Sequence, residues 1–192
     1  MIILSCKDII KSFGIEVLLN KVTFNINEGE KIGLIGPNGA GKSTLFKILT
    51  SETTDYDSGE LYIDKNKTIG YLSQHLSLEK DNTIYEELQL VFSQLINLEN
   101  KISQLEEELN KPYDHDKEEF HNKLIRDYTT ASETYINCGG YTFRAEISRV
   151  LKGLGFSEND FDTTIDLLSG GQKTRVALCK LLLIKPDILL LD

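Results

Sequence analysis

The feature that most constrains this chain is a glycine-rich loop, GPNGAGKST, at residues 36–44. It fits the pattern G-x-x-x-x-G-K-[ST], in which backbone N–H groups surround the phosphates of a ligand, the lysine reaches the terminal phosphates and the hydroxyl binds Mg²⁺. An apolar run of strand type precedes the loop at residues 31–35, and a helical pattern follows it at residues 45–49. Because a strand, this loop and a helix in that order set the helix dipole against the anion, the sequence predicts a nucleotide site here.

A second glycine-rich stretch, LSGGQ, lies far along the chain at residues 168–172. A site with one phosphate-binding loop does not need it. The stretch is explained if the chain offers a second phosphate-binding surface to the nucleotide of another subunit. The two motifs together therefore predict an assembly in which a nucleotide lies between two modules.

The composition limits the cellular setting and the partners. The 192 residues suffice for one domain with a subdomain. Three cysteines lie far apart without metal-site spacing, which favours free thiols in a reducing, cytoplasmic compartment. The formal net charge of −9 argues against a broad nucleic-acid-binding surface. The leucine-rich stretch at residues 181–191 is interrupted by Lys185, Pro186 and Asp187, so the sequence predicts no membrane span.

The first seventy residues and the last few are rich in strand patterns. Alternating or continuous apolar runs are separated by two polar turns, at residues 27–29 and 64–67. The final run is continuous, which suits a parallel strand buried on both faces. The strands expected from these patterns are at residues 2–5, 22–26, 31–35, 61–63, 68–72 and 188–191.

The middle of the chain is helical and acidic. A capping-box pattern at residues 83–86 opens the first helix, and a leucine-rich heptad seam continues from Leu88 to Leu109 before Pro112. A second helix follows, and the short connection between the two predicts an antiparallel hairpin. Residues 83–135 carry twelve Asp and Glu against five Lys and Arg, which is most of the net negative charge. The apolar face of the second helix is formed by Phe120, Leu124, Tyr128, Ala131 and Tyr135, and that of a third helix, ending near Gly155, by Ile147, Val150, Leu151 and Leu154.

The two glycine-rich motifs, in this order, resemble those of the ATP-binding-cassette (ABC) family of ATPases. The resemblance covers the whole chain. It implies an α/β fold, namely a P-loop NTPase module with a mixed β core, an antiparallel β subdomain and a helical subdomain that bears a helical-hairpin arm. It also implies ATP and Mg²⁺ as ligands, with ATP held head to tail between the phosphate loop of one module and the signature of a second. The expected parts are a nucleotide-binding β-rich core at residues 1–74, a helical subdomain at 83–155 with its arm at about 83–135, and the signature helix and Walker B strand at 168–192.

The same resemblance gives roles to single residues. Phe13 takes the place of the aromatic residue that stacks on adenine, where the family more often has tyrosine. Gln74 matches the Q-loop glutamine, which contacts Mg²⁺. Asp192, at the end of the Walker B strand, and Ser43 are expected to hold the same ion. The residues expected to act in catalysis are Lys42, Gln74 and Asp192; those expected to bind ATP are Phe13, Gly36, Pro37, Asn38, Gly39, Ala40, Gly41, Lys42, Ser43, Thr44 and Gln74, with Ser169, Gly170, Gly171 and Gln172 acting on the ATP of the partner module.

Within the family, the chain most resembles the ABC-F group, soluble proteins with two ABC modules in one polypeptide. The stretch at residues 173–178, KTRVAL, and the long separation of Gln74 from Leu168 carry this resemblance, because the group has a helical arm at that point. The resemblance implies the ribosome and its tRNA as partners, for a translation factor or an antibiotic-resistance protein, with contacts near residues 111–113. In the family a glutamate that polarises the attacking water follows the Walker B aspartate, and the sequence ends at Asp192. We therefore expect a truncated N-terminal module with negligible ATP turnover of its own.

Three alternatives remain at this point. The chain could be the ATP-hydrolysing subunit of an ABC membrane transporter, whose partner is a membrane subunit. It could also belong to an ABC-type DNA repair or chromosome protein, although the insertion in such proteins is far longer. Finally, the hairpin could be an enlarged helical subdomain without a function of its own.

Overall fold

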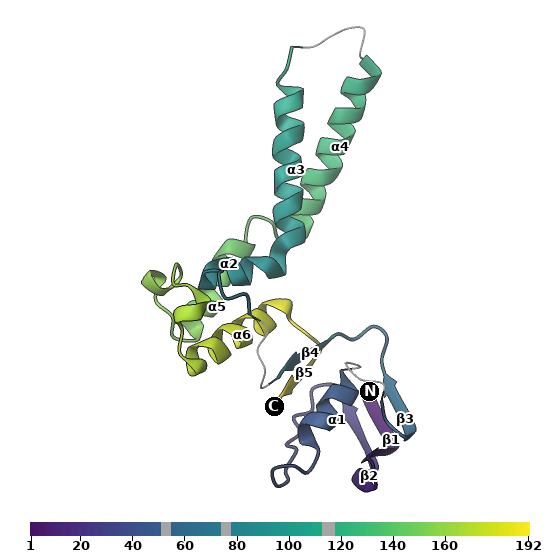
Figure 1. Cartoon of the computed structure of the whole chain (residues 1–192). Coiled ribbons are helices and arrows are strands. Elements are labelled where there is room, and N and C mark those ends of the chain that lie inside the picture. The colour runs from purple at the N-terminus through teal and green to yellow at the C-terminus, as the bar shows by residue number, and fades with distance from the viewer. Residues whose placement is uncertain (51–54, 74–77, 113–117) are drawn as a thin grey trace. The chain divides into compact units, whose positions relative to one another are not determined.

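The computed structural model describes residues 1–50, 55–73, 78–112 and 118–192, and the chain divides into two units (Figure 1). Unit 1 comprises Met1–Ser77 and Ile184–Asp192, and unit 2 comprises Leu78–Leu183. The named strands belong to unit 1, and helices α2 to α5 belong to unit 2. The expected α/β class is confirmed.

The first sheet of unit 1 is antiparallel and has three strands. They are β1 (Ile2–Phe13), β2 (Glu16–Asn27) and β3 (Ser58–Ile63), with β1 in the centre. The strands expected at residues 2–5, 22–26 and 61–63 are confirmed within these longer elements, and β1 and β2 form a long hairpin that closes at Gly14.

A bulge in β1 explains why the sequence predicted only its first residues. Leu4 and Cys6 are buried at every second position, but the next buried residue is Ile9, three positions later. The extra residue is Asp8, whose φ of 52° is left-handed. Gly59 packs against this bulge so closely that a Cβ there would lie 2.6 Å from the Asp8 carbonyl oxygen. The bulge breaks the alternation on which the prediction of strands depends.

Helix α1 (Lys42–Leu49) follows the phosphate loop, as expected, and packs into the core of unit 1. Its apolar side is buried among residues of both sheets. The packing of these buried residues fixes the position of the whole helix, including its first turn at the phosphate loop. The buried members of this core are Ile3, Leu4, Cys6, Ile9, Leu19, Leu45, Ile48, Leu49, Ile188 and Leu190.

The second sheet is the parallel pair β4 (Ile69–Leu72) and β5 (Ile188–Leu191), which confirms the strands expected there. The register pairs the two strands from end to end, from Ile69 with Ile188 to Leu72 with Leu191. The pairing extends one residue further, since the N–H of Asp192 donates to the Leu72 carbonyl oxygen at 3.1 Å. The expected Walker B aspartate therefore lies directly beside the end of β4.

Two of the expectations for unit 1 are wrong in part. Residues 31–35 form no strand, because no described residue pairs with them, and Ile35 is 96% exposed. Likewise, β5 is covered on one face and not on both: Leu189 and Leu191 are exposed while Ile188 and Leu190 are buried. A parallel strand needs a hydrogen-bonded neighbour on each side and a layer on each face to be fully buried. In the described residues, β5 has a neighbour on one side.

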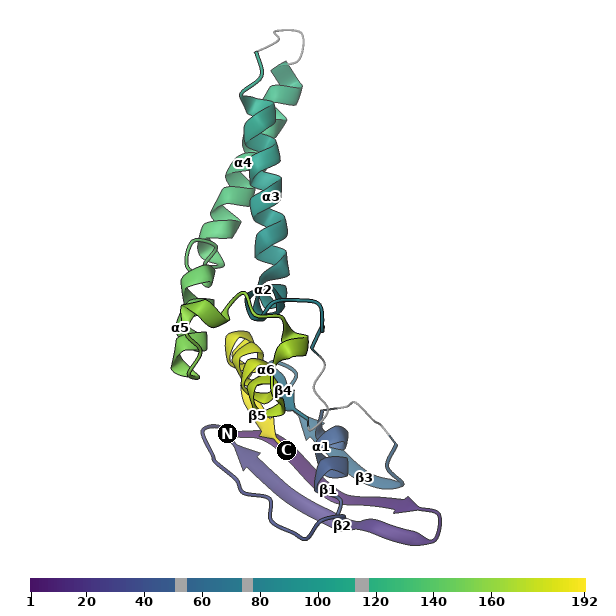
Figure 2. The ribbon, with the colours of Figure 1, turned by 60° about the vertical axis from the view of Figure 1, so that its left-hand side comes forward.

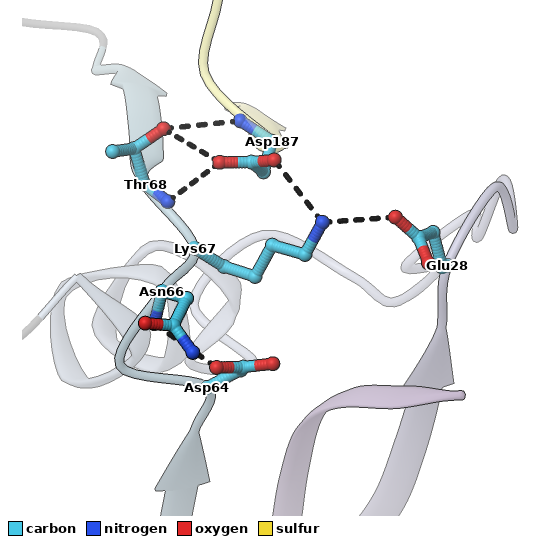
Figure 3. Close-up of polar contacts among 6 residues, drawn as sticks. All are labelled: Glu28, Asp64, Asn66, Lys67, Thr68 and Asp187. Atoms are coloured by element: carbon cyan, nitrogen blue, oxygen red, sulfur yellow. Dashed lines mark hydrogen bonds and ion pairs between the residues drawn. The ribbon is translucent and has the colours of Figure 1, made fainter.

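A polar cluster fixes the beginning of the parallel pair (Figure 3). The carboxylate of Asp187 accepts hydrogen bonds from the Thr68 N–H at 2.9 Å and from the Thr68 hydroxyl at 3.0 Å. Lys67 bridges Asp187 and Glu28, with Nζ 3.2 Å and 2.8 Å from the two carboxylates. Because these contacts join three segments far apart in the sequence, they set the register of β4 against β5 at the end opposite Asp192.

Unit 2 consists of helices around its own core, which is separate from that of unit 1. Among the described residues, none of its helices has the length and hydrophobicity that a bilayer-spanning segment needs. The third helix expected from the sequence is confirmed as α5, and α6 begins within the LSGGQ stretch. The elements are α2 (Ile84–Gln89), η1 (Leu90–Phe92), α3 (Ser93–Leu109), α4 (Glu118–Asn137), α5 (Phe143–Gly153), η3 (Glu158–Asp160), η4 (Ile165–Leu167) and α6 (Gly170–Ile184).

Helices α3 and α4 form the expected antiparallel hairpin, which extends away from the other helices of unit 2 in both views (Figures 1 and 2). The capping box is confirmed: Thr83 and Glu86 exchange side chain-to-backbone hydrogen bonds at the start of α2. The continuous helix through the heptad seam is wrong, because the 3₁₀ turn η1 separates α2 from α3. Phe92 ends this turn and packs its ring on Phe143 of α5, with 5.1 Å between the centroids. This contact accompanies the break in the helix.

The apolar face of α4 is buried along most of its length. Leu124, Ala131 and Tyr135 are buried, as expected, and the Tyr128 hydroxyl donates to Glu106 of α3 at 3.0 Å. Phe120 is 54% exposed, because it lies near the first residue of α4, where the helix has few neighbours. The part of the hairpin nearest the other helices of unit 2 is therefore well packed, and its outer end is exposed to solvent.

The cluster around Asp187 gives a pH-dependent prediction. The N–H and hydroxyl of Thr68, together with Lys67, hold the pKa of Asp187 below its usual value, and Lys67 lowers the pKa of Glu28. A carboxylate whose pKa is lowered by folding stabilises the fold above the unfolded pKa, near 4, and this contribution is lost as the pH falls through the folded pKa. We expect Asp187→Ala to lower the melting temperature at pH 7, by a difference that shrinks as the pH falls below about 4.

The control for this measurement is Glu60→Ala. Glu60 pairs with Lys7 at 3.6 Å on the surface of the same unit, where both side chains are largely exposed. Surface pairs of this kind contribute little. At each pH from 3 to 7, calorimetry should give this variant nearly the same melting temperature as the wild type. An Asp187→Ala difference that is the same at both ends of this range would contradict the account of the cluster.

Candidate nucleotide-binding site

A cavity with a volume of about 410 Å³ lies where α1 begins. Its lining comes from the phosphate loop with the first turn of α1, from β2 and from the residue after β5. The structure thus brings much of the expected loop together with the expected Walker B aspartate. The lining residues are Leu18, Asn38, Gly39, Gly41, Lys42, Ser43, Thr44 and Asp192.

Two glycines shape the loop that enters this cavity. Gly39 and Gly41 have φ values of 82° and 90°, which are left-handed and strained for any residue with a Cβ. Gly41 is also the N-cap of α1, and a Cβ there would lie 2.9 Å from Leu19 Cδ2 and 3.0 Å from Leu18 Cγ. The backbone at Gly41 therefore approaches β2 as only glycine can. It turns the unpaired N–H groups of the first helical turn into position for an anion.

The ammonium of Lys42 lies over the loop. Its Nζ donates to the carbonyl oxygens of Gly36 and Pro37, at 2.9 Å each. These acceptors are neutral, and a phosphate oxygen that came within reach would be a stronger, charged acceptor. Lys42 is thus placed to contact the terminal phosphates of a nucleotide, as the sequence predicts.

Ser43 and Asp192 supply the oxygen atoms that a Mg²⁺ ion would need. Both line the cavity, one from the first turn of α1 and one from the end of β5. The Tyr71 hydroxyl donates to Asp192 Oδ2 at 3.2 Å and orients the carboxylate. A serine hydroxyl and a carboxylate are hard oxygen ligands, which suit an ion that completes its shell with water and substrate phosphates. The residues present therefore fit Mg²⁺ together with a nucleotide.

The expected adenine-stacking residue, Phe13, lies at the end of β1 and does not line the cavity. Its ring is 60% exposed. Lys11 Nζ lies 5.0 Å from the ring centroid and also pairs with Asp55 at 2.7 Å. The ring is therefore held by a cation and remains accessible to a stacking partner.

The LSGGQ stretch forms the start of α6 in unit 2. The N–H of Ser169 donates to Gln172 Oε1 at 2.9 Å, and the N–H of Gln172 donates to Ser169 Oγ at 3.3 Å. This is a capping box, in which two side chains satisfy backbone groups at the helix start. Gly170 and Gly171 between them are exposed and bring no side chain to the surface. The motif thus forms an exposed helix start that another molecule can approach closely.

One expected site residue, Gln74, lies outside the described residues, as does Tyr113 of the expected arm contact. Two residues at the site were not predicted from the sequence. Leu18 lines the cavity from β2, and Tyr71 holds Asp192. Leu18 belongs to no motif in the sequence and could be read only as an apolar residue of a strand. Tyr71 lies next to the last residue of β4, a position from which a hydroxyl can reach the neighbouring strand.

The fold and the site define a P-loop nucleotide-binding module. The family model described as "ABC transporter" matches residues 19–192 of the chain. This protein therefore belongs to the ABC family, whose cassettes bind ATP with Mg²⁺ and hydrolyse it.

Two relatives and one solved structure place the chain within this family. It is 38% identical, over all of its length, to the uncharacterized ABC transporter ATP-binding protein YfmM of Bacillus subtilis, and covers 36% of that protein. It is 34% identical, over 91% of its length, to the energy-dependent translational throttle protein EttA of Escherichia coli K12, and covers 30% of it. The dimeric bacterial ABC transporter cassette MJ0796 matches with a TM-score of 0.63 and 25% identity, over 98% of this chain and 73% of that one. The chain thus spans about a third of the length of these two curated relatives.

Removal of the Lys42 ammonium should weaken nucleotide binding. Charge-assisted contacts are typically worth ~1.5–3 kcal/mol, so Lys42→Ala should weaken Mg-ATP binding roughly ten- to a hundredfold in calorimetry. Lys42→Arg should also fail, because a planar guanidinium does not replace a compact ammonium. Lys47→Ala removes the same charge from the exposed last turn of α1 and should leave the affinity unchanged. Equal affinity in wild type and Lys42→Ala would show that this loop is not the nucleotide site.

The two loop glycines should differ in their tolerance of a methyl group. Gly39→Ala meets nothing within 4 Å and bears only the strain of its positive φ, about 1–2 kcal/mol. Gly41→Ala bears the same strain and also collides with Leu18 and Leu19. We therefore expect the melting temperature and the ATP affinity to fall further in Gly41→Ala. Gly33→Ala, with open space and no positive φ, is the control; equal losses in all three variants would contradict the geometry of the loop.

Proposed function

We propose that this chain is an ATP-binding module of an ABC-F protein, which couples ATP binding and hydrolysis to an action on the ribosome. The observation that carries the proposal is the α3–α4 hairpin inserted between β4 and the signature helix. Its sequence position is that of the arm in the ABC-F group. The similarity to EttA, named a translational throttle protein, supports the same function. The setting that we propose is the cytoplasm.

The hairpin has the properties of a rigid arm. Its base is fixed by Glu99 of α3, which accepts hydrogen bonds from Arg144 of α5 at 2.6 and 3.1 Å and from the Tyr135 hydroxyl of α4 at 3.1 Å. The Arg144 guanidinium is the main cause that keeps the pKa of Glu99 below its usual value, and the Tyr135 hydroxyl is a lesser one. The carboxylate at the foot of the hairpin therefore stays ionised. Beyond the base, α3 and α4 pack on each other. A lever of this kind can carry a contact made at its outer end to the rest of unit 2.

The charge of the outer end limits what it can bind. Lys111 is exposed but pairs with Glu108, and Glu106 and Glu107 add further negative charge. This surface would repel RNA phosphates, so we expect recognition through ribosomal proteins or through a few local contacts to exposed nucleotides.

ATP would be held between two modules. In this arrangement Lys42 and the first turn of α1 bind the phosphates, and Ser43 and Asp192 hold the Mg²⁺ that neutralises the charge of the transferred phosphoryl group. The exposed start of α6, from Ser169 to Gln172, would contact the ATP of a second module. The similarity to a cassette whose structure is dimeric supports the pairing of two modules.

The second candidate function is the ATP-hydrolysing subunit of a membrane transporter. It is favoured by the similarity of the fold to cassettes of transporters. The two functions differ in the role of the hairpin, which a transporter subunit does not need.

Shortening the hairpin tests the proposed function directly. Replacement of residues 110–116 by a short glycine linker, in the complete protein, should leave ATP binding intact, because the cavity lies in unit 1. It should impair co-sedimentation with ribosomes and the effect on translation. Gln104→Ala, a single exposed change on α3 that alters no charge, is the matched control and should behave as wild type. If ribosome binding and the translation phenotype both survive the deletion, the arm hypothesis fails and the transporter function is favoured.

A further inference from the structure

Glu87 is a carboxylate in the core of unit 2 that the proposed nucleotide site does not use. Its side chain is fully buried. Three donors satisfy it: Lys180 Nζ at 2.6 Å on one oxygen, and Asn82 Nδ2 at 3.1 Å and the Glu79 N–H at 3.3 Å on the other. A buried charge is costly unless it is paired and hydrogen-bonded, so this arrangement needs a reason beyond packing.

The partners of Glu87 lie on two segments that are far apart in the sequence. Glu87 lies in α2, and Lys180 lies in α6, the helix that begins with the signature (Figures 1 and 2). Lys180 is roughly 15 Å along α6 from Gly170. The ion pair therefore holds the signature helix from its side, well away from its exposed start.

The chain just before the signature is held by the same part of the molecule. Residues 79–87, here called the strap, pair with the segment that leads into the LSGGQ stretch. Ile165 and Asp166 donate backbone hydrogen bonds to Asn82 and Lys80, at 2.9 and 3.2 Å. Two further backbone bonds, Ile84 to Thr163 at 3.0 Å and Tyr85 to Phe161 at 3.1 Å, extend this pairing.

The strap thus holds the chain on both sides of the signature: the segment before it by backbone hydrogen bonds, and α6 after it through Lys180. Apolar contacts between helices are non-directional and allow a helix to rotate or slide. A carboxylate with three donors has one satisfied position, because hydrogen bonds weaken steeply away from their preferred distance and angle. The ion pair with Lys180 therefore fixes the rotation of α6 about its own axis. That rotation decides which way Ser169 and the exposed N–H groups of the following glycines point.

We propose that Glu87 is a positioning residue for the signature: through Lys180 and the strap, it holds the start of α6 in the orientation that engages the ATP of the partner module. This role rests on the proposed function for its effect on catalysis. The positioning itself is a property of unit 2 alone.

Hydrogen exchange tests the positioning on the 192-residue chain. Glu87→Gln keeps the shape of the side chain and an oxygen acceptor but removes the charge that holds Lys180. The double variant Glu87→Gln/Lys180→Met removes both charges and leaves no buried ion unpaired. In both variants we expect the hydrogen-bonded amides within residues 168–173, those of residues 168, 169, 172 and 173, to exchange faster, by roughly tenfold or more. Glu99→Gln breaks a different ion pair of unit 2, Glu99–Arg144, and should leave these amides unchanged.

ATP turnover by the complete two-module protein tests the consequence. Since a 1 Å misplacement can cost about a hundredfold, Glu87→Gln should lower kcat roughly ten- to a hundredfold, with KM for ATP nearly unchanged. A general loss of stability would not lower kcat while leaving KM unchanged. Glu99→Gln, compared at a matched melting temperature, is the control for such a loss. Unchanged exchange at residues 168–173, or an unchanged kcat, would overturn the role of Glu87. Co-sedimentation of the wild-type protein with ribosomes does not depend on the role of Glu87. Its absence would show that the proposed function fails, whatever the result for Glu87.

Discussion

The parallel pairing of β4 with β5 is the constraint on which the candidate site depends. The register of the two strands is set at one end by Asp187, which accepts two hydrogen bonds from Thr68 and forms an ion pair with Lys67. At the other end the same register delivers Asp192 beside the end of β4. A shift by one residue would turn Asp192 away from the cavity and reverse which side of β5 is buried. The polar cluster at the start of the strands therefore determines where the carboxylate lies at their finish.

A second constraint is the close approach of the phosphate loop to β2. Gly41 has a left-handed φ and no room for a Cβ beside Leu18 and Leu19, so the loop is seated against the hairpin of the antiparallel sheet. Helix α1 is in turn anchored by its buried residues. The loop, the helix start and Asp192 thus come from three separately anchored segments. This is how a cavity for a highly charged ligand can be formed before the ligand binds.

Much of this arrangement was predictable from local chemistry. The phosphate loop, the capping box at Thr83 and the hairpin were predicted because each depends on residues close together in the sequence. The strand at residues 31–35 was predicted from the same kind of pattern and is wrong, because pairing depends on a neighbouring strand that an apolar run does not specify. The bulge at Asp8, the break at Phe92 and the contact of Tyr71 with Asp192 were not predictable. Each involves a partner distant in sequence, namely Gly59, Phe143 or Asp192.

In the proposed function, this chain is one half of a composite site: its loop would bind one ATP, and its signature, oriented by the strap, would act on another. A structure of the complete protein with Mg-ATP, under conditions that block hydrolysis, tests this claim most directly. We expect the phosphates of one ATP at residues 39–44, with Mg²⁺ between Ser43 and Asp192, and the start of α6 against the phosphates of an ATP held by the other module. An ATP bound at residues 39–44 while Ser169 to Gln172 face solvent, or contact that same ATP, would contradict the account.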